Sequence, residues 1–73
     1  MHTVNLNKYI LHLYINNSFD LDLLTNELFI NKLNTEEYPR GIVEQLEFVG
    51  NLTKIQIYDI NHNLMLSSEY LIQ

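Results

Sequence analysis

The sequence predicts an α+β fold, a two-layer sandwich in which a small, mainly antiparallel sheet of three to four strands carries two helices on one face. Residues 8–15 and 53–60 have the β-branched and aromatic content of strands, with a period of two. Residues 19–32 repeat apolar side chains at helical spacing, and Pro39 and Gly50 bracket a second helical stretch. A chain of 73 residues is expected to form one domain over 1–73.

The first predicted strand, residues 8–15, is apolar on both sides. One face carries Tyr9, Leu11, Leu13 and Ile15. The other face carries Ile10, His12 and Tyr14. A strand of this kind lies in the middle of a sheet, or its second face is covered by something else, such as another subunit.

The stretch YINNSFDLDLL, residues 14–24, allows two structures. Asn16-Asn17 could form a hairpin turn before a second strand, or Ser18 could cap a helix. The helix is favoured, because the residues that follow contain no Gly or Pro to end a strand, and Leu21, Leu24 and Leu28 recur at i, i+3 and i+7. We therefore expect one helix over 19–32.

The charges of that helix suit its dipole. Asp20 and Asp22 fall in its first turn, where the helix dipole favours negative charge. Lys32 falls in its last turn, where the dipole favours positive charge. Its opposite side carries Phe19, Leu23 and Ile30, so contacts with protein on more than one side are expected.

A second helix is predicted over 39–49. Pro39 suits the first helical position and Gly50 the position after the end. An apolar stripe runs through Ile42, Leu46 and Val49, with Glu44 and Glu47 pointing away from it. Because Gly41 weakens a helix and residues 42–48 also alternate, a strand over 42–49 stays open.

The C-terminal part predicts a hairpin. Residues 53–60 place Ile55 and Ile57 on one face, and Tyr58 and Ile60 on the other. The sequence NHN at 61–63 is typical of a tight turn, and residues 63–67 are expected to return as a strand. After that strand, Ser67 or Ser68 caps a last helical turn, or the strand continues.

Composition limits the classes of partner and chemistry. Without cysteine the chain has no disulfides, thiolate metal sites or Cys nucleophile. A net charge of −5 disfavours direct binding of nucleic acid or an anionic membrane. No secretory signal or membrane-length apolar run is present, so a cytoplasmic protein is expected. A core this small calls for reinforcement by a protein partner or a homodimer.

Candidate catalytic and metal motifs are incomplete. Asp59 begins the D-x-N-x-N pattern of a calcium loop, but Leu64 stands where Gly is needed and Tyr70 where Glu is needed. The three histidines lie at a mobile N-terminus, in a strand and in a turn, without metal-ligand spacing. Phosphate-binding glycine loops and G-x-S-x-G or H-E-x-x-H motifs do not occur. We therefore expect a protein that is not an enzyme and that binds no metal and no cofactor.

Both ends of the chain resemble a group of small uncharacterised bacterial domains. At the start, a strand is followed by NSFD, the helical LLTNELFI and the loop EYPRG; near the end, a strand leads into LMLSSEYL. Leu21 stands where such domains often have Pro. The resemblance implies the β-α order of the opening and no catalytic residue.

Two sets of residues are candidate binding surfaces. The first is an acidic helical face: Asp20, Asp22, Glu27, Glu36, Glu37, Glu44 and Glu47. Carboxylates at i and i+3 on a helix lie about 5–6 Å apart, close to the spacing of phosphates along a nucleic-acid strand of roughly 6–7 Å. The second is the back face of the sheet: Ile10, His12, Tyr14, Tyr58 and Ile60. Aromatic residues at such a place are typical of interfaces.

The function that these features favour is non-catalytic binding. We expect a small acidic inhibitor or immunity protein, of the kind that phages and mobile elements make, which blocks the working surface of a partner protein. The partner would be basic. For a partner that handles nucleic acids, the acidic face would bind by imitating a row of phosphates. The alternative is a structural homodimer, or a small subunit of a larger assembly, with no inhibitory role.

Overall fold

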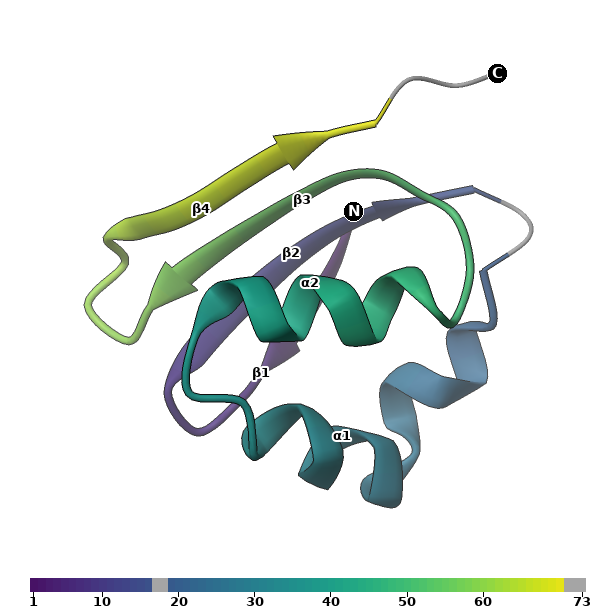
Figure 1. Ribbon diagram of the computed structural model, residues 1–73, viewed down its shortest axis with the longest axis horizontal. Helices are drawn as coiled ribbons and strands as arrows, with labels where there is room; N and C mark the ends of the chain where they lie inside the picture. The colour runs from purple at the N-terminus through teal and green to yellow at the C-terminus, as the bar shows by residue number, and fades with distance from the viewer. Residues whose placement is uncertain (17–18, 71–73) are drawn as a thin grey trace.

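The computed structural model describes residues 1–16 and 19–70. Its elements are β1 (His2–Asn5), β2 (Tyr9–Ile15), the 3-10 helix η1 (Leu21–Thr25), α1 (Glu27–Asn34), α2 (Pro39–Glu47), β3 (Leu52–Asp59) and β4 (Leu64–Glu69). The strands form one antiparallel sheet in the order β1-β2-β3-β4, and both α-helices lie over one face of it (Figure 1). The predicted α+β fold is confirmed.

The core lies between the sheet and the helices. Leu11 pairs with Ile57 and Leu13 with Ile55 across β2 and β3, so these four side chains form two adjacent rows on the helical side. The fully buried side chains are Leu11, Leu13, Ile55 and Ile57 from the sheet and Leu33, Ile42, Val43 and Leu46 from the helices. Alternation in the strands and helical spacing in α2 therefore bury the faces that the sequence predicted.

β1 was not among the predicted strands, and His2 was expected in a mobile terminus. The structure pairs His2 with Leu13 and Asn5 with Ile10, so β1 forms the edge of the sheet beside β2. Val4 and Leu6 are buried, and the Leu6 amide donates a hydrogen bond of 2.8 Å to the Tyr9 carbonyl oxygen. β1 therefore covers one side of the core that the three predicted strands would leave open.

The prediction of one helix over 19–32 was wrong. The chain forms η1 and then α1, because Asn26 has an extended backbone between them and its side chain accepts a hydrogen bond of 3.1 Å from the Phe29 amide. η1 begins in the same way, since Asp20 Oδ1 accepts from the Asp22 amide at 3.1 Å. The predicted cap, Ser18, lies outside the described residues.

The break at Asn26 also changes which leucines are buried. The expected stripe of Leu21, Leu24 and Leu28 does not lie on one face: Leu28 is 81% exposed and Leu21 is exposed as well, whereas Leu24 packs against the core. A new helix starts at a new angle, so the spacing across the break no longer places residues together. Phe19 and Leu33 supply the buried contacts instead.

α2 confirms the predicted second helix and excludes the strand. Pro39 is its first residue, as expected, and Phe48 is its C-cap, so the helix ends before Gly50.

Two hydrogen bonds join the start of β2 and the turn before it to the helical layer. The Tyr9 hydroxyl donates to the Glu37 carbonyl oxygen at 2.6 Å, and the Asn7 amide donates to Asn34 Oδ1 at 2.8 Å.

The hairpin between β3 and β4 is organised by Asp59. Its Oδ1 accepts hydrogen bonds from the amides of Asn61 at 2.8 Å and Asn63 at 3.0 Å, and His62 has a φ of 64° in the left-handed region. The predicted turn is confirmed, but β3 ends at Asp59, so Ile60 lies in the turn and is 63% exposed. β4 continues to Glu69, as the second alternative expected.

Candidate protein-binding surfaces

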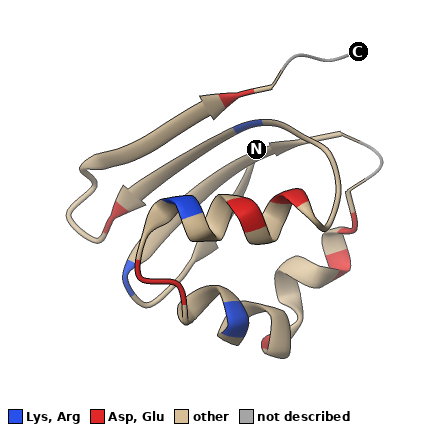
Figure 2. Ribbon diagram, in the orientation of Figure 1, with Lys and Arg blue, Asp and Glu red and all other residues tan. Residues whose placement is uncertain are grey.

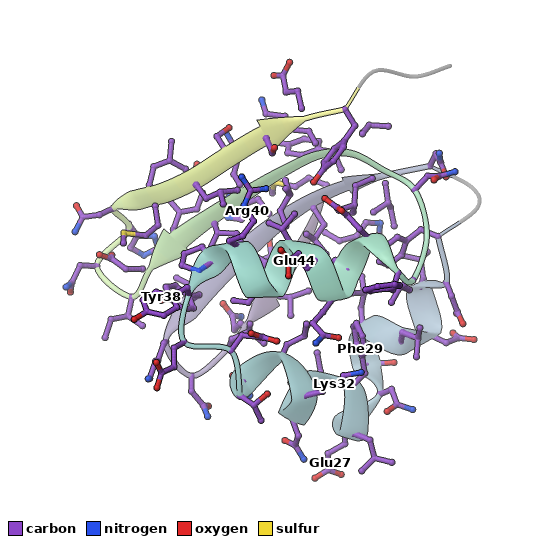
Figure 3. All side chains as sticks on the ribbon, in the orientation of Figure 1. Glu27, Phe29, Lys32, Tyr38, Arg40 and Glu44 are labelled. Carbon is purple, nitrogen blue, oxygen red and sulfur yellow. The ribbon has the colours of Figure 1, made fainter. Side chains whose placement is uncertain are left out.

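The acidic residues singled out from the sequence all lie in the helical layer. They are Asp20 and Asp22 at the start of η1, Glu27 at the start of α1, Glu36 and Glu37 between the helices, and Glu44 and Glu47 on α2. Acidic and basic residues share this layer (Figure 2). Figure 3 shows Arg40 and Glu44 projecting from α2, and Glu27 and Lys32 from α1. Both helices therefore carry cations, so a continuous row of carboxylates does not form.

Several of these carboxylates have structural partners within the chain. Asp20 caps η1, and Glu36 Oε1 accepts a hydrogen bond of 3.1 Å from Gln45 Nε2. The Glu36 carboxylate also occupies the space beside Gly41 that a β-carbon would need. Glu47 Oε1 accepts a hydrogen bond of 2.9 Å from the Tyr70 hydroxyl. The acidic residues are thus held in different ways at different places.

One part of the layer combines charge with an exposed aromatic ring. Phe48 follows α2 and is 91% exposed, the largest exposed fraction among the large apolar side chains of the described residues. It comes four residues after Glu44, so both point away from the core on the same side of the helix. Among the described residues, an open hollow of about 420 Å³ is lined by Glu44, Glu47 and Phe48. We call these three residues the α2 patch.

Tyr70 fixes one carboxylate of the α2 patch. Its amide donates to the Thr53 carbonyl oxygen at 2.9 Å, and its ring packs against the core, so the hydroxyl reaches Glu47 from a fixed position. Burial raises the pKa of the Tyr70 phenol, and the hydrogen bond and negative charge of Glu47 raise it further. The phenol therefore stays protonated and keeps donating to Glu47.

The second face of the sheet, which points away from the helices, is apolar at one end. Ile10 pairs with Tyr58, and Tyr58 lies opposite Leu64 at a bulge that adds Met65 to β4. Leu64 is 53% exposed and Met65 is 52% exposed, while Ile10 and Tyr58 are half-buried. We call these four residues, which cross three strands, the apolar row. Ile60 was predicted on this face but lies in the turn beyond it.

The rest of this face is polar and balanced in charge. The rings of His12 and Tyr58 have centroids 4.8 Å apart. Further along the strands, Lys54 Nζ lies 5.4 Å from the Tyr14 ring centroid and 3.5 Å from Glu69 Oε1. The structure therefore brings Ile10, His12, Tyr14 and Tyr58 together on one face, as the sequence predicted.

Phe48, Leu64 and Met65 were not predicted as site residues. In the sequence, Phe48 belongs to the alternation over residues 42–48 that leaves a strand open. A signal for it does exist, because an aromatic residue four positions after Glu44 falls on the polar side of a helix. Leu64 and Met65 had no such signal, since strict alternation places adjacent strand residues on opposite faces and only the bulge changes this.

The Asp59 carboxylate stabilises the turn between β3 and β4 through its hydrogen bonds. The backbone hydrogen bond from Asn63 lowers the pKa of the Asp59 carboxyl most, and the Asn63 side chain and Asn61 amide lower it as well.

Within residues 1–16 and 19–70, no group of three or more His, Asp or Glu side chains lies in a position to hold a metal ion. Within the same ranges, no helix has the length and apolar character needed to cross a membrane.

No protein-family model, no curated protein and no solved structure matches this chain. The likeness to small bacterial domains therefore remains a resemblance of short motifs, and the geometry of the two surfaces carries the functional argument.

Proposed function

We propose that this protein is a non-catalytic protein-binding module of the small acidic inhibitor type, and that the α2 patch contacts its partner. The single observation that carries the proposal is Phe48, which is 91% exposed beside the carboxylates of Glu44 and Glu47. A large ring left in water beside an open hollow gains contact area when a partner covers it.

The chemistry of the patch fits an arginine side chain. A guanidinium stacks on an aromatic face, an interaction of about 0.5–2 kcal/mol. Its N–H groups also donate charge-assisted hydrogen bonds to carboxylates. Because Tyr70 already holds Glu47, less side-chain freedom is lost when a cation binds there. A lysine offers one compact charge and stacks less well, so arginine is the better ligand.

The partner class follows from that chemistry. Proteins that handle nucleic acids hold phosphates with arginine and lysine, so a patch that binds arginine can take the place of the nucleic acid. The net charge of −5 attracts such a protein from a distance and speeds association. The acidic residues outside the α2 patch serve this long-range role, so they do not need to form one row.

The test is a nuclear magnetic resonance titration of the isotope-labelled protein with an arginine-rich peptide and a lysine-rich peptide of equal length. We expect shifts at the amides of residues 44–48 and at the Phe48 ring, with tighter binding of the arginine peptide. Phe48→Ala should weaken binding. Leu28→Ala is the matched control, because Leu28 is also strongly exposed and follows an acid, Glu27, but does not line the hollow.

The proposal fails under either of two results. One is that the two peptides bind alike and shift amides near all acidic residues to the same extent, which describes a solvated acidic layer. The other is that Leu28→Ala weakens binding as much as Phe48→Ala does. Shifts confined to the second face of the sheet would instead place the partner on the opposite side of the molecule.

A further inference from the structure

We infer that the second face of the sheet binds a second copy of this chain, as a symmetric face-to-face dimer centred on the apolar row. This inference is independent of the proposed partner, because the apolar row and the α2 patch lie on opposite faces. The protein would then display two α2 patches, one on each outer side of the dimer.

The apolar row lacks a cover within the described chain. Both α-helices lie over the other face (Figure 1), where Leu11 and Ile57 are fully buried. Their neighbours in the same strands, Ile10 and Tyr58, are only half-buried, and in β4 more than half of Met65 is exposed. An aromatic ring with aliphatic side chains on both sides, spread across three strands, matches the apolar centre of protein interfaces.

The distribution of charge favours a second copy as the occupant. Of the nine acidic residues, seven lie in the helical layer, on the other side of the molecule. The remaining two are Asp59, whose carboxylate is used by the turn, and Glu69, which lies 3.5 Å from Lys54. Two copies of a strongly acidic chain can therefore meet through this face without bringing their acidic layers together.

The order of rows along the sheet places the symmetry axis. The apolar row lies at one end of the face, and the Lys54–Glu69 pair lies at the other end. A twofold axis that runs across the strands through the middle of the face would set one copy's apolar row on the other copy's ion pair and bury charge against apolar groups. An axis near Tyr58 sets apolar row on apolar row and leaves both ion pairs at the solvated rim.

The size of the sheet predicts the strength of the dimer. Four strands about 4.8 Å apart, with about 3.3 Å per residue along each strand, make a face smaller than the roughly 800 Å² per partner of a standard interface. A dimer of this size lies at the weak end of specific association, so it is expected to form only at high protein concentration. The added burial still reinforces a domain with a small core.

The test is sedimentation equilibrium of the full chain from micromolar to millimolar concentration. Wild type should pass from monomer to dimer. Met65→Lys should raise the dissociation constant about tenfold or more, because it buries an unpaired charge against an apolar partner. Met65 is already half exposed, so this variant keeps its fold. Phe48→Lys is the matched control on the opposite face, and it should dimerise as wild type does.

Isotope-filtered measurements on a mixed labelled and unlabelled dimer locate the contact. Cross-peaks between the Tyr58 ring and the Ile10 or Leu64 methyl groups of the other copy support the inference. A strict monomer at millimolar concentration overturns it, and so does a dimer that Met65→Lys leaves unchanged. Met65→Lys should also bind the arginine peptide as wild type does, so failure of the dimer and failure of the α2 patch are seen separately.

Discussion

The Tyr70 hydroxyl donates a hydrogen bond of 2.9 Å to Glu47 Oε1 and joins two residues that are 23 positions apart. Tyr70 follows the last strand and Glu47 ends α2, so this bond ties the edge of the sheet to the end of the helix that presents Phe48. One contact thus links the stability of the hairpin to the geometry of the α2 patch.

Removing the Tyr70 hydroxyl should change how stability depends on alkaline pH. Burial and Glu47 raise the pKa of the Tyr70 phenol above the usual value of about 10, so the fold favours its neutral form. That contribution is complete below pH about 10 and is lost as the pH rises through the raised pKa. In urea unfolding, Tyr70→Phe should lose less stability than wild type between neutral and alkaline pH. An equal loss in both proteins contradicts this; Tyr38→Phe, at a well-exposed tyrosine, is the control.

Asn26→Ala should destabilise the protein by about 1 kcal/mol, the usual cost of losing a helix N-cap. The Asn26 side chain accepts from the Phe29 amide at 3.1 Å, and this amide is left without that acceptor in the variant. Asn31→Ala in the same helix is the control, because Ala is the better helix former and the change should be neutral or slightly stabilising. If both variants unfold at the same urea concentration, Asn26 does not set the start of α1.

Leu33→Ala should leave the protein largely unfolded. Leu33 is fully buried, so its truncation costs about 2–5 kcal/mol, which is comparable with the roughly 3–5 kcal/mol that a core of this size supplies. Leu28→Ala, one helical turn and one residue earlier, should change stability by no more than about 0.5 kcal/mol. Circular dichroism during thermal unfolding measures both. A strongly destabilising Leu28→Ala would show that Leu28 is buried, as the continuous helix over 19–32 predicted.

Asp59→Ala should lower the free energy of unfolding most at neutral pH. The amides of Asn63 and Asn61 stabilise the Asp59 carboxylate and lower its pKa in the fold, so this stabilisation is present above the usual pKa of about 3.9. It is lost as the pH falls through the lowered pKa. The difference in unfolding free energy between wild type and Asp59→Ala should therefore shrink in acid. A difference that does not depend on pH would show that the charge of Asp59 does not act in the turn.

Regular spacing in the sequence was enough for most of the fold. Period-two alternation identified β2 and β3, and Pro39 with Ile42 and Leu46 identified α2, because in each case burial and local preference agree. The first helix was different, since the leucine spacing crosses Asn26. The extended backbone of Asn26 ends η1, and its side-chain hydrogen bond to the Phe29 amide starts α1. β1 has only four residues, and its formation depends on pairing with β2 rather than on its own pattern.

The candidate surfaces were less accessible to sequence reasoning. Alternation placed Ile10, His12, Tyr14 and Tyr58 on one face, since this follows from strand geometry alone. The bulge that adds Met65 to the apolar row depends on how β4 pairs, which no local pattern shows. The partners of the carboxylates, such as Tyr70 for Glu47, are distant in sequence and appear only in the folded chain.

We expect a basic partner to bind the α2 patch. This binding is measured with a partner that is captured on the immobilised protein from a cell lysate and then purified. The affinity of that partner is measured over a salt series for wild type and for three variants. One combines Glu44→Lys with Glu47→Lys, and one combines Asp22→Lys with Glu27→Lys, which changes the net charge equally elsewhere in the helical layer. The third is Tyr58→Ala on the sheet face.

We expect reversal at Glu44 and Glu47 to weaken binding about tenfold or more at low salt and to flatten its salt dependence, since it removes the direct charge contacts. The Asp22 and Glu27 reversal should have a smaller effect that high salt removes, and Tyr58→Ala should have little effect. Binding that survives the reversal on α2 but is lost with Tyr58→Ala contradicts binding at the α2 patch and places the partner on the sheet face.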